Sequence, residues 1–261
     1  MFLSSLHRSQ YFNNSTIQPI MAKFEKEETL DIDNMEKALD IASHVYDMLP
    51  NLVVISGFLE PRDPDKESIS AYLNESWIRL AEEVEKHGLI THPRIAPWMK
   101  ALQAAGILVK KHPFSILAMG KRASKTRAPF SINPIVDTYN AISMDLINPG
   151  GAYDMDQMTG SLKLRLSDGG EVFQPLGNGK VSHTLPGEIV YSDESDVLTR
   201  MFLWQQSDKA KIANSSKKLV FVFELLDEMG QGLVNDACRK IEEKFMSLLE
   251  AKVYGVSIQR K

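Results

Sequence analysis

Residues 162–166 read Leu-Lys-Leu-Arg-Leu, and this short stretch decides the fold class. Leucines at every second position, with cations between them, are typical of a strand that buries one face. On its N-terminal side apolar residues recur at helical spacing, and on its C-terminal side short apolar strands follow one another. Helices and strands that are separated along the chain in this way predict an α+β domain rather than a doubly wound sheet.

The N-terminal side of this stretch predicts five helices and one strand. Asp33 and Glu36 form a variant of the capping box, and the apolar stripe that follows them ends at Pro50. Gly88 and Gly106 are placed to end the second and third helices. The expected helices are 33–49, 69–87, 94–105, 114–123 and 135–146, and the expected strand is 52–59.

The C-terminal side predicts mostly strands. Asp168-Gly169-Gly170 turns the chain from residues 162–166 into residues 171–176, so these two segments are expected to form a hairpin. The other expected elements are strands at 188–192, 198–204 and 219–226, a helix at 231–251 and a last strand at 252–258.

The composition excludes several classes of protein. The chain has 261 residues, of which 43% are hydrophobic and 25% charged, and this excludes a mainly disordered or fibrous chain. No apolar run reaches the roughly 20 residues that cross a bilayer, so no membrane association is expected. The single cysteine, Cys238, excludes an intrachain disulfide and a multi-cysteine zinc site. It also favours a reducing compartment, so we expect the protein to be cytoplasmic.

The N-terminus is expected to precede the folded domain. Residues 1–23 contain no acid and a single arginine, Arg8, whereas a transit peptide is rich in arginine. Periodic structure begins only after Met21. We therefore expect residues 1–24 to be a disordered extension or the result of an upstream start, and residues 25–261 to form one domain.

Charge is distributed unevenly along the chain. The protein has 30 Lys and Arg against 34 Asp and Glu, a net charge of −4, yet residues 92–136 contain eight cations and no acid. A solvated face and a surface that contacts RNA phosphates both explain such a basic segment. The RNA-contact candidates within it are Arg94, Lys110, Lys111, Lys121, Arg122, Lys125 and Arg127.

Two polar features are not explained by folding alone. Glu224 lies within Leu-Val-Phe-Val-Phe-Glu-Leu-Leu at 219–226, where a carboxylate is costly unless it has a partner. Its side chain either points to solvent at the strand end or holds an ammonium group or a water. Asp137 and Asn140 are three residues apart and share one helix face, whereas Asn133 is placed to cap that helix.

Other signatures of catalysis or cofactor binding are absent from the sequence. None of the six histidines has a histidine four residues away or a nearby cysteine, so no metal site is expected. The sequence contains no helix-opening G-x-G-x-x-G and no G-x-S-x-G. We therefore expect no cofactor.

Three segments, 131–140, 152–156 and 162–166, together resemble the B3/4 domain of the phenylalanyl-tRNA synthetase β subunit. There a similar helix with the pattern Pro-Val-Val-Asp-x-x-Asn is followed by a turn and a strand pair. The resemblance covers residues 52–226, which is most of the chain.

Two further patterns are similar to the stand-alone bacterial and archaeal proteins that are built on this domain. One is His92-Pro-Arg-Ile-x-x-Trp98 followed by Gly106, and the other is the spacing of Arg200 and Trp204. The order and spacing of all these segments carry the resemblance, because no single motif is as specific as a zinc signature.

The resemblance implies both a fold and an activity. The fold would be a single α+β domain with a β-barrel-like or β-sandwich core flanked by helices. In the synthetase this domain hydrolyses tyrosine that is wrongly attached to tRNA, so the resemblance implies a trans-acting deacylase for the aminoacyl 3′ end of a tRNA. DNA is not expected as a partner.

The resemblance also implies a site. Glu224 matches the glutamate that closes the corresponding strand of the editing site, so it is the expected catalytic residue. The residues that the resemblance places in the substrate pocket are Asn133, Asp137, Asn140, Gly151, Arg200, Met201, Phe202 and Trp204.

This sequence departs from the synthetase pattern at the pocket. The histidine of the synthetase turn falls at Gly151, and a Gly-Gly pair that lines the pocket falls near Met201-Phe202. Two larger side chains should narrow the pocket, which favours an amino acid smaller than tyrosine. The ATP-site motifs of the synthetase core are missing, so no aminoacylation is expected.

Three functions are therefore compatible with the sequence. A trans-acting deacylase is favoured by Glu224, and a tRNA- or RNA-binding module without catalysis is favoured by the lost histidine. A small-molecule-binding or interaction protein that kept only the fold is the third, and the basic segment argues against it because a metabolite binder would not need that charge.

Overall fold

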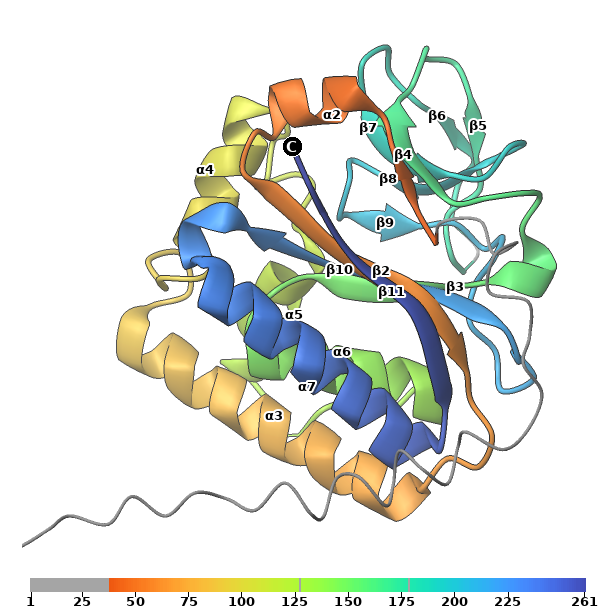
Figure 1. The fold of residues 1–261 in the computed structure, drawn as a ribbon. Coiled ribbons are helices and arrows are strands. Elements are labelled where there is room, and N and C mark those ends of the chain that lie inside the picture. The colour runs from red at the N-terminus through yellow and green to blue at the C-terminus, as the bar shows by residue number, and fades with distance from the viewer. Residues whose placement is uncertain (1–37, 127, 178) are drawn as a thin grey trace, which may run out of the picture. The chain divides into compact units, whose positions relative to one another are not determined.

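The computed structural model describes residues 38–126, 128–177 and 179–261, which contain both helices and strands (Figure 1). The strands are β1 Asp40–Ile41, β2 Leu52–Glu60, β3 Gly150–Asp154, β4 Lys163–Leu166, β5 Val172–Phe173, β6 Ser182–His183, β7 Ile189–Ser192, β8 Val197–Arg200, β9 Gln205–Gln206, β10 Leu219–Leu226 and β11 Lys252–Arg260. The helices are α2 Ser43–Met48, α3 Lys66–His87, α4 Ala96–Ala104, α5 Ser115–Ala123, α6 Pro134–Leu146 and α7 Gln231–Leu249.

Strand β10 lies inside a four-stranded antiparallel sheet with the order β11-β2-β10-β3. All eight of its residues are buried, because the sheet is covered on both faces at this strand. The apolar run at 219–226 therefore predicts the strand correctly, and it also forms the centre of the core.

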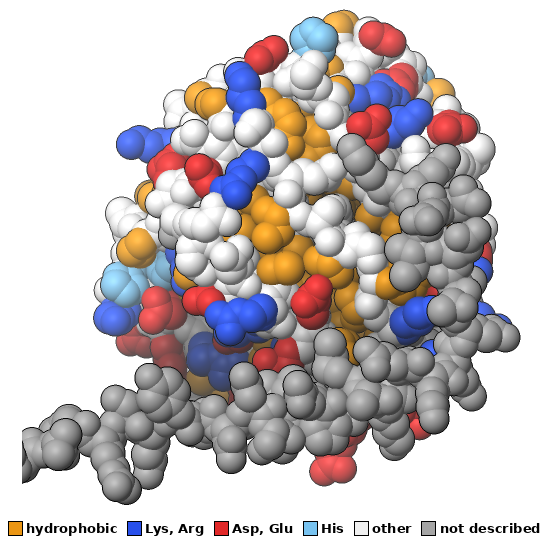
Figure 2. Space-filling model, in the orientation of Figure 1, with side chains coloured by type: hydrophobic (Ala, Val, Ile, Leu, Met, Phe, Trp, Pro, Cys, Tyr) orange, Lys and Arg blue, Asp and Glu red, His pale blue; other side chains and the backbone are white. Residues whose placement is uncertain are grey.

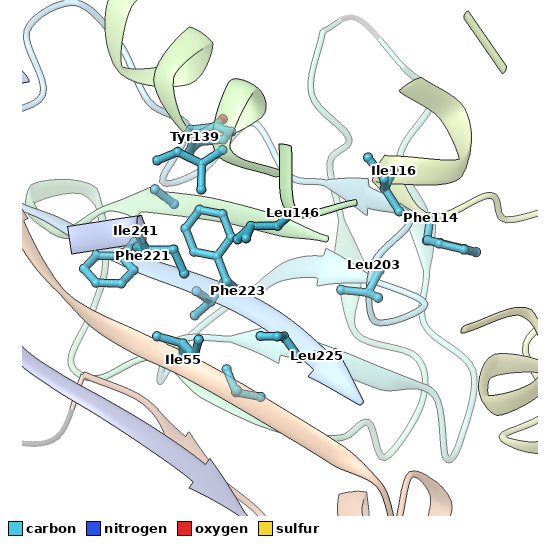
Figure 3. Packing of buried hydrophobic residues seen from close by; sticks show 14 of the residues in the cluster. Ile55, Phe114, Ile116, Tyr139, Leu146, Leu203, Phe221, Phe223, Leu225 and Ile241 are labelled. Atoms are coloured by element: carbon cyan, nitrogen blue, oxygen red, sulfur yellow. The ribbon is translucent and has the colours of Figure 1, made fainter. Parts of the chain in front are cut away.

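The two faces of β10 meet different layers, because successive side chains of a strand point to opposite faces. The rings of Phe221 and Phe223 lie 5.1 and 6.2 Å from the ring of Phe245 in α7. Figure 3 shows both rings on the side of Tyr139 and Ile241. Helices α3, α5, α6 and α7 lie on this side of the sheet (Figure 1).

A second sheet, with the order β1-β4-β7-β8-β9, covers part of the opposite face. Side chains bridge the two sheets: Tyr153 Oη of β3 lies 2.8 Å from Thr199 Oγ1 of β8, and the rings of Tyr153 and Tyr191 are 5.8 Å apart. The result is a mixed domain in which helices and two sheets form layers. Neither strand order returns to its starting strand among the described residues, so the expected barrel-like closure is not observed there.

The helix expected at 33–49 is much shorter in the structure. Helix α2 contains only Ser43–Met48, and Asp40–Ile41 forms the strand β1, which runs parallel to β4. The backbone N–H groups of Asp40 and Ala42 donate to carbonyls of β4 at 2.9 Å, and this pairing replaces the first helical turns. Asp33 and Glu36, the expected capping pair, lie outside the described residues.

The hairpin expected between 162–166 and 171–176 is also wrong. Strand β4 pairs with β7, and β5 pairs with β6. Gly169 and Gly170 both have positive φ values, +89° and +77°, and they turn the chain away from β4 instead of back along it. Strand β3 was not predicted either, because Gly150 and Gly151 were interpreted as the end of the helix before it.

The other expected helices and strands are present to within a few residues, except at the end of β8. This strand ends at Arg200 instead of continuing to 204, since Met201 and Phe202 adopt positive φ values of +49° and +63°. Asp65 and Asn133 cap α3 and α6 by accepting from the N–H groups of Ser68 and Val136. Of the described helices, none has the length and apolar character needed to cross a membrane.

Candidate functional site

Glu224 lies on the face of β10 that is turned toward the second sheet. Its neighbours Phe223 and Leu225 alternate with it and therefore point to the opposite face. The Glu224 side chain is 2% exposed, so the solvent-facing position that the sequence left open does not occur. Tyr191 Oη, from β7, donates a hydrogen bond of 2.6 Å to Glu224 Oε1. A carboxylate thus lies between the two sheets.

A cavity of about 130 Å³ borders this carboxylate, and we call it the Glu224 cavity. It is bounded by β3 and β10 of the first sheet, by β8, β9 and the turn between them, and by Tyr191 and Ser115. Its lining includes four of the residues that the sequence assigned to the site, which are Gly151, Phe202, Trp204 and Glu224. The structure therefore brings together residues from three separate segments of the chain.

The second carboxylate oxygen of Glu224 is the unusual feature of this cavity. Oε2 is buried and has no hydrogen-bond partner among the described residues. Burial raises the pKa of Glu224 to about 7, although the hydrogen bond from Tyr191 acts in the opposite direction. Burial and the nearby Glu224 also raise the pKa of Tyr191, which keeps its hydroxyl protonated as a donor. Glu224 therefore has one oxygen held by Tyr191 and one buried oxygen without a partner among the described residues.

The aromatic wall of the Glu224 cavity is fixed by stacking. Phe202 is fully buried, and its ring lies 6.0 Å from that of Tyr191 and 6.2 Å from that of Trp98. Trp204 is packed by His112, whose ring lies 4.3 Å away. Phe202 and its neighbour Met201 have left-handed backbone conformations, which favour glycine and which two non-glycine residues occupy here.

Two glycines of β3 form the opposite wall and differ in their surroundings. A Cβ at Gly150 would lie 2.3 Å from the ring of Phe223, so no side chain fits there. A Cβ at Gly151 would meet no atom within 4 Å. Gly151 pairs with Val222 and so shares the face of Glu224, which means that the missing side chain enlarges the cavity.

Arg200 and Met201, which the sequence placed in the pocket, do not line the Glu224 cavity. Arg200 is buried and forms a two-pronged ion pair with Glu188, with Nε–Oε1 at 2.7 Å and Nη2–Oε2 at 2.6 Å. The Met201 N–H donates to the same Glu188 carboxylate at 3.1 Å. These contacts hold the turn that presents Phe202, so the two residues support the wall without forming it.

Asn133 and Asp137 border a different hollow, of about 610 Å³, which also includes Lys66 and Ile69 of α3. We call it the Asp137 hollow. The side chain of Asn133 caps α6, and Asp137 accepts hydrogen bonds from the backbone N–H of Ile132, at 2.8 Å, and from the Ser131 hydroxyl. Asn140 lines neither the Glu224 cavity nor this hollow. The structure thus separates these three residues from Glu224.

Part of the basic segment borders the Glu224 cavity. Lys110 and Lys111 are exposed and directly precede His112, which packs on Trp204. Ser115 lines the cavity and begins α5, and Arg122 lies about 10 Å further along that helix. Exposed cations therefore lie at both ends of α5: Lys110 and Lys111 precede it, Lys121 and Arg122 lie in its last turn, and Lys125 follows it.

Two other members of the basic segment differ. The guanidinium of Arg94 donates to the carbonyl of Leu146, and burial lowers the pKa of Arg94, so this side chain supports the end of α6. Arg127 lies outside the described residues. The face of the molecule that Figure 2 shows carries cations, anions and apolar side chains side by side.

Sequence reasoning missed Tyr191, Tyr153 and Thr199, which contribute the hydroxyl groups around Glu224. Tyr191 was visible only as one residue of the expected strand at 188–192, and nothing local shows that it faces β10. Within the described part of the chain, no group of three or more His, Cys, Asp or Glu side chains is placed to hold a metal ion.

Comparison with known proteins gives a family match and partial likenesses to curated and solved proteins. The family model described as the B3/4 domain matches residues 98–244, which include all residues that line the Glu224 cavity. The phenylalanine–tRNA ligase β subunit of Bartonella henselae is 40% identical over 68 residues, which are 26% of this chain and 8% of that subunit. This chain therefore spans only a small part of that relative.

A solved structure is similar in part. It is an N-terminal fragment of the phenylalanyl-tRNA synthetase β subunit from Pyrococcus horikoshii, with 10% sequence identity and a TM-score of 0.42. The likeness covers 83% of this chain and 50% of that one.

Proposed function

The chain belongs to the B3/4 domain family, and from this premise we propose that it is a trans-acting aminoacyl-tRNA deacylase. It would hydrolyse the ester between a wrongly attached amino acid and the 3′ end of a tRNA. One observation supports this most strongly: Glu224 lines the cavity, and its buried Oε2 has no hydrogen-bond partner among the described residues. An unpaired carboxylate oxygen is costly to bury, so a ligand that donates to it gains binding energy.

The ester chemistry requires few groups from the protein. Water attacks the carbonyl carbon, the bond from this carbon to the ribose oxygen breaks, and the ribose oxygen takes up a proton. In our proposal Glu224 binds the ammonium of the aminoacyl group and so holds the ester at the cavity mouth. With a pKa of about 7 Glu224 is only partly ionised near neutral pH, and an ammonium group beside it would favour the charged form.

The exposed cations near the cavity supply the second part of the proposal. Lys110 and Lys111 precede the His112 contact with Trp204, and Lys121, Arg122 and Lys125 lie at the other end of α5. In our proposal these side chains contact phosphates of the tRNA acceptor end while the aminoacyl group enters the Glu224 cavity.

A tRNA-binding module without catalysis is the second candidate. The observation in its favour is Gly151, where the cavity wall carries no side chain at the place of the family's histidine. Such a protein would bind the aminoacyl end and protect the ester. Neither candidate includes aminoacylation.

The decisive experiment is deacylation of a panel of mischarged tRNAs by the wild-type chain and by Glu224→Gln. The substitution keeps the side-chain volume and removes a charge-assisted hydrogen bond of about 1.5–3 kcal/mol, so hydrolysis should slow roughly ten- to a hundredfold. An ammonium anchor predicts that KM rises, whereas a role in orienting water predicts that kcat falls.

Glu75→Gln is the matched control, because the Glu75 side chain is 65% exposed on α3 and its activity should stay unchanged. Esters that stay intact with the wild-type chain, together with tight tRNA binding, would favour the non-catalytic module. Normal hydrolysis by Glu224→Gln would remove this residue from the mechanism.

A further inference from the structure

The Glu224 cavity has a size that constrains its occupant. Its volume is about 130 Å³, whereas cavities that hold drug-sized ligands have about 300–1,000 Å³. Benzene, with about six heavy atoms, fills an engineered cavity of about 150 Å³. An alanyl or seryl group has about five or six heavy atoms and a tyrosyl group about twelve, so on this scale only the small groups fit.

The walls that set this size are rigid. Phe202 stacks on Tyr191 and packs at a tilt against Trp98, and it lies in a backbone conformation fixed by the Glu188 contacts of its two preceding residues. A rearrangement that admits a larger ligand would have to break this stack. Gly151, on the opposite wall, is where the space is open.

We propose that this cavity selects aminoacyl groups of the size of glycine, alanine or serine and excludes aromatic ones. Phe202 forms one wall of the cavity, and Gly151 leaves the room that the small side chain would occupy. This inference rests on the proposed deacylase function, but it concerns the size of the ligand and can be tested by binding alone.

The first test measures how fast the full chain hydrolyses glycyl-, alanyl-, seryl-, phenylalanyl- and tyrosyl-tRNA. Each rate is divided by the uncatalysed rate of the same ester. Alanyl- and seryl-tRNA should be hydrolysed at least tenfold faster than tyrosyl-tRNA, since even one methylene of misfit changes a rate by about 10–200-fold. Phe202→Ala should raise the tyrosyl to alanyl ratio at least tenfold. Phe245→Ala removes an equally buried ring on the opposite face of β10 and should leave the ratio unchanged.

Gly151→Val is a second variant that does not depend on Phe202→Ala folding. Its side chain would project from the face of β3 shared with Val222 and Glu224, where there is room for a Cβ. It should slow alanyl and seryl hydrolysis at least tenfold relative to glycyl. Thermal unfolding followed by circular dichroism establishes that the variants are folded.

A binding measurement separates this inference from the proposed function. Non-hydrolysable amide analogues of alanyl- and tyrosyl-adenosine should bind with at least a tenfold preference for the alanyl form. That preference without ester hydrolysis would overturn the deacylase proposal and keep the size inference. Hydrolysis of tyrosyl-tRNA as fast as alanyl-tRNA, or equal binding of both analogues, would overturn the size inference and keep the deacylase.

Discussion

The Glu224 cavity and the Asp137 hollow both border a buried carboxylate, and they differ in what the fold does with it. The Asp137 hollow is the larger, about 610 Å³ against about 130 Å³. Asp137 accepts from the Ile132 N–H and the Ser131 hydroxyl, so the loop before α6 uses this acid. Glu224 keeps one buried oxygen without a hydrogen-bond partner in the described part of the chain. The two sites therefore differ in the hydrogen bonding of their carboxylates as well as in size, and the unsatisfied oxygen is at the smaller one.

The two acids also occupy different elements. Asp137 lies in the first turn of α6, where a negative charge is stabilised by the helix dipole and by the Ile132 N–H and Ser131 hydroxyl that donate to it. Glu224 lies in a strand, which has no comparable dipole to stabilise a negative charge. The hydroxyl of Tyr191 donates the hydrogen bond that its carboxylate receives among the described residues. Asp137 thus stabilises the fold, whereas the charged form of Glu224 opposes it.

The largest expected difference between the two sites is in the pH dependence of stability. The pKa of Glu224 is about 7 in the folded chain and about 4.5 when unfolded, so the folded state binds more protons between these values. Stability should therefore fall as the pH rises from about 4.5 to 7, by on the order of 3 kcal/mol from this group. Glu224→Gln should remove this loss and be the more stable protein at pH 8.

Urea unfolding of the wild type and Glu224→Gln at a series of pH values measures this effect. The difference between the two proteins is the quantity to follow, because the other carboxylates are common to both. A difference that does not change between pH 4.5 and 7 would mean that Glu224 is not shifted by burial, and the contrast with Asp137 would be lost.

Asp137 should show the opposite behaviour on substitution. Asp137→Ala leaves the N–H of Ile132 and the hydroxyl of Ser131 without their acceptor, so the free energy of unfolding should fall by about 1–3 kcal/mol. Deacylation per folded molecule should stay within about twofold of the wild type. A large loss of activity in a folded Asp137→Ala protein would show that the two hollows act together, contrary to the separation described above.

How far the sequence predicts this site can be seen from the same two acids. An acid inside an apolar strand violates a local rule, and Glu224 was identified for that reason. Asn133 and Asp137 also form a polar pattern, but Asn133 caps α6 and Asp137 binds the loop before it, so the pattern does not distinguish folding from function.

The fold shows the same limit. Apolar periodicity predicts most helices and strands, because the spacing of apolar residues within one element is visible in a short stretch of sequence. The pairing of β4 with β7 and of β5 with β6, and the contact of Tyr191 with Glu224, join segments far apart in the chain. No local signal in the sequence determines them. The short strand β3 was missed because its glycines usually end a helix, whereas here Gly150 leaves room for Phe223.

A smaller difference is expected in how cations near the Glu224 cavity and near the Asp137 hollow affect the salt dependence of tRNA binding. Charge reversal of both Lys121 and Arg122 should lower the slope of log affinity for tRNA against log salt by about 0.7–0.9 for each lost phosphate contact. Lys66→Glu changes an exposed cation at the Asp137 hollow and should leave the slope unchanged. Equal effects of both changes in filter-binding titrations would indicate a general charge effect instead of a tRNA path toward the Glu224 cavity.

The smallest expected effect concerns the backbone beside the Glu224 cavity. Met201 has φ +49°, a left-handed conformation that costs a non-glycine residue about 1–2 kcal/mol. No residue that lines the Asp137 hollow has a positive φ within the described ranges, so strain of this kind is found only at the smaller site of the two. Met201→Gly should relieve it.

Comparison with Met201→Ala isolates this strain, because both variants lose the methionine side chain and keep the N–H bond to Glu188. A glycine at position 201 relieves the backbone strain, but it costs about 0.5–1 kcal/mol in conformational entropy. Met201→Gly should therefore exceed Met201→Ala in stability by up to about 1 kcal/mol. Urea unfolding at a fixed pH measures the difference. An alanine variant as stable as the glycine variant would mean that the turn relaxes without glycine, and that Phe202 is held by its ring contacts alone.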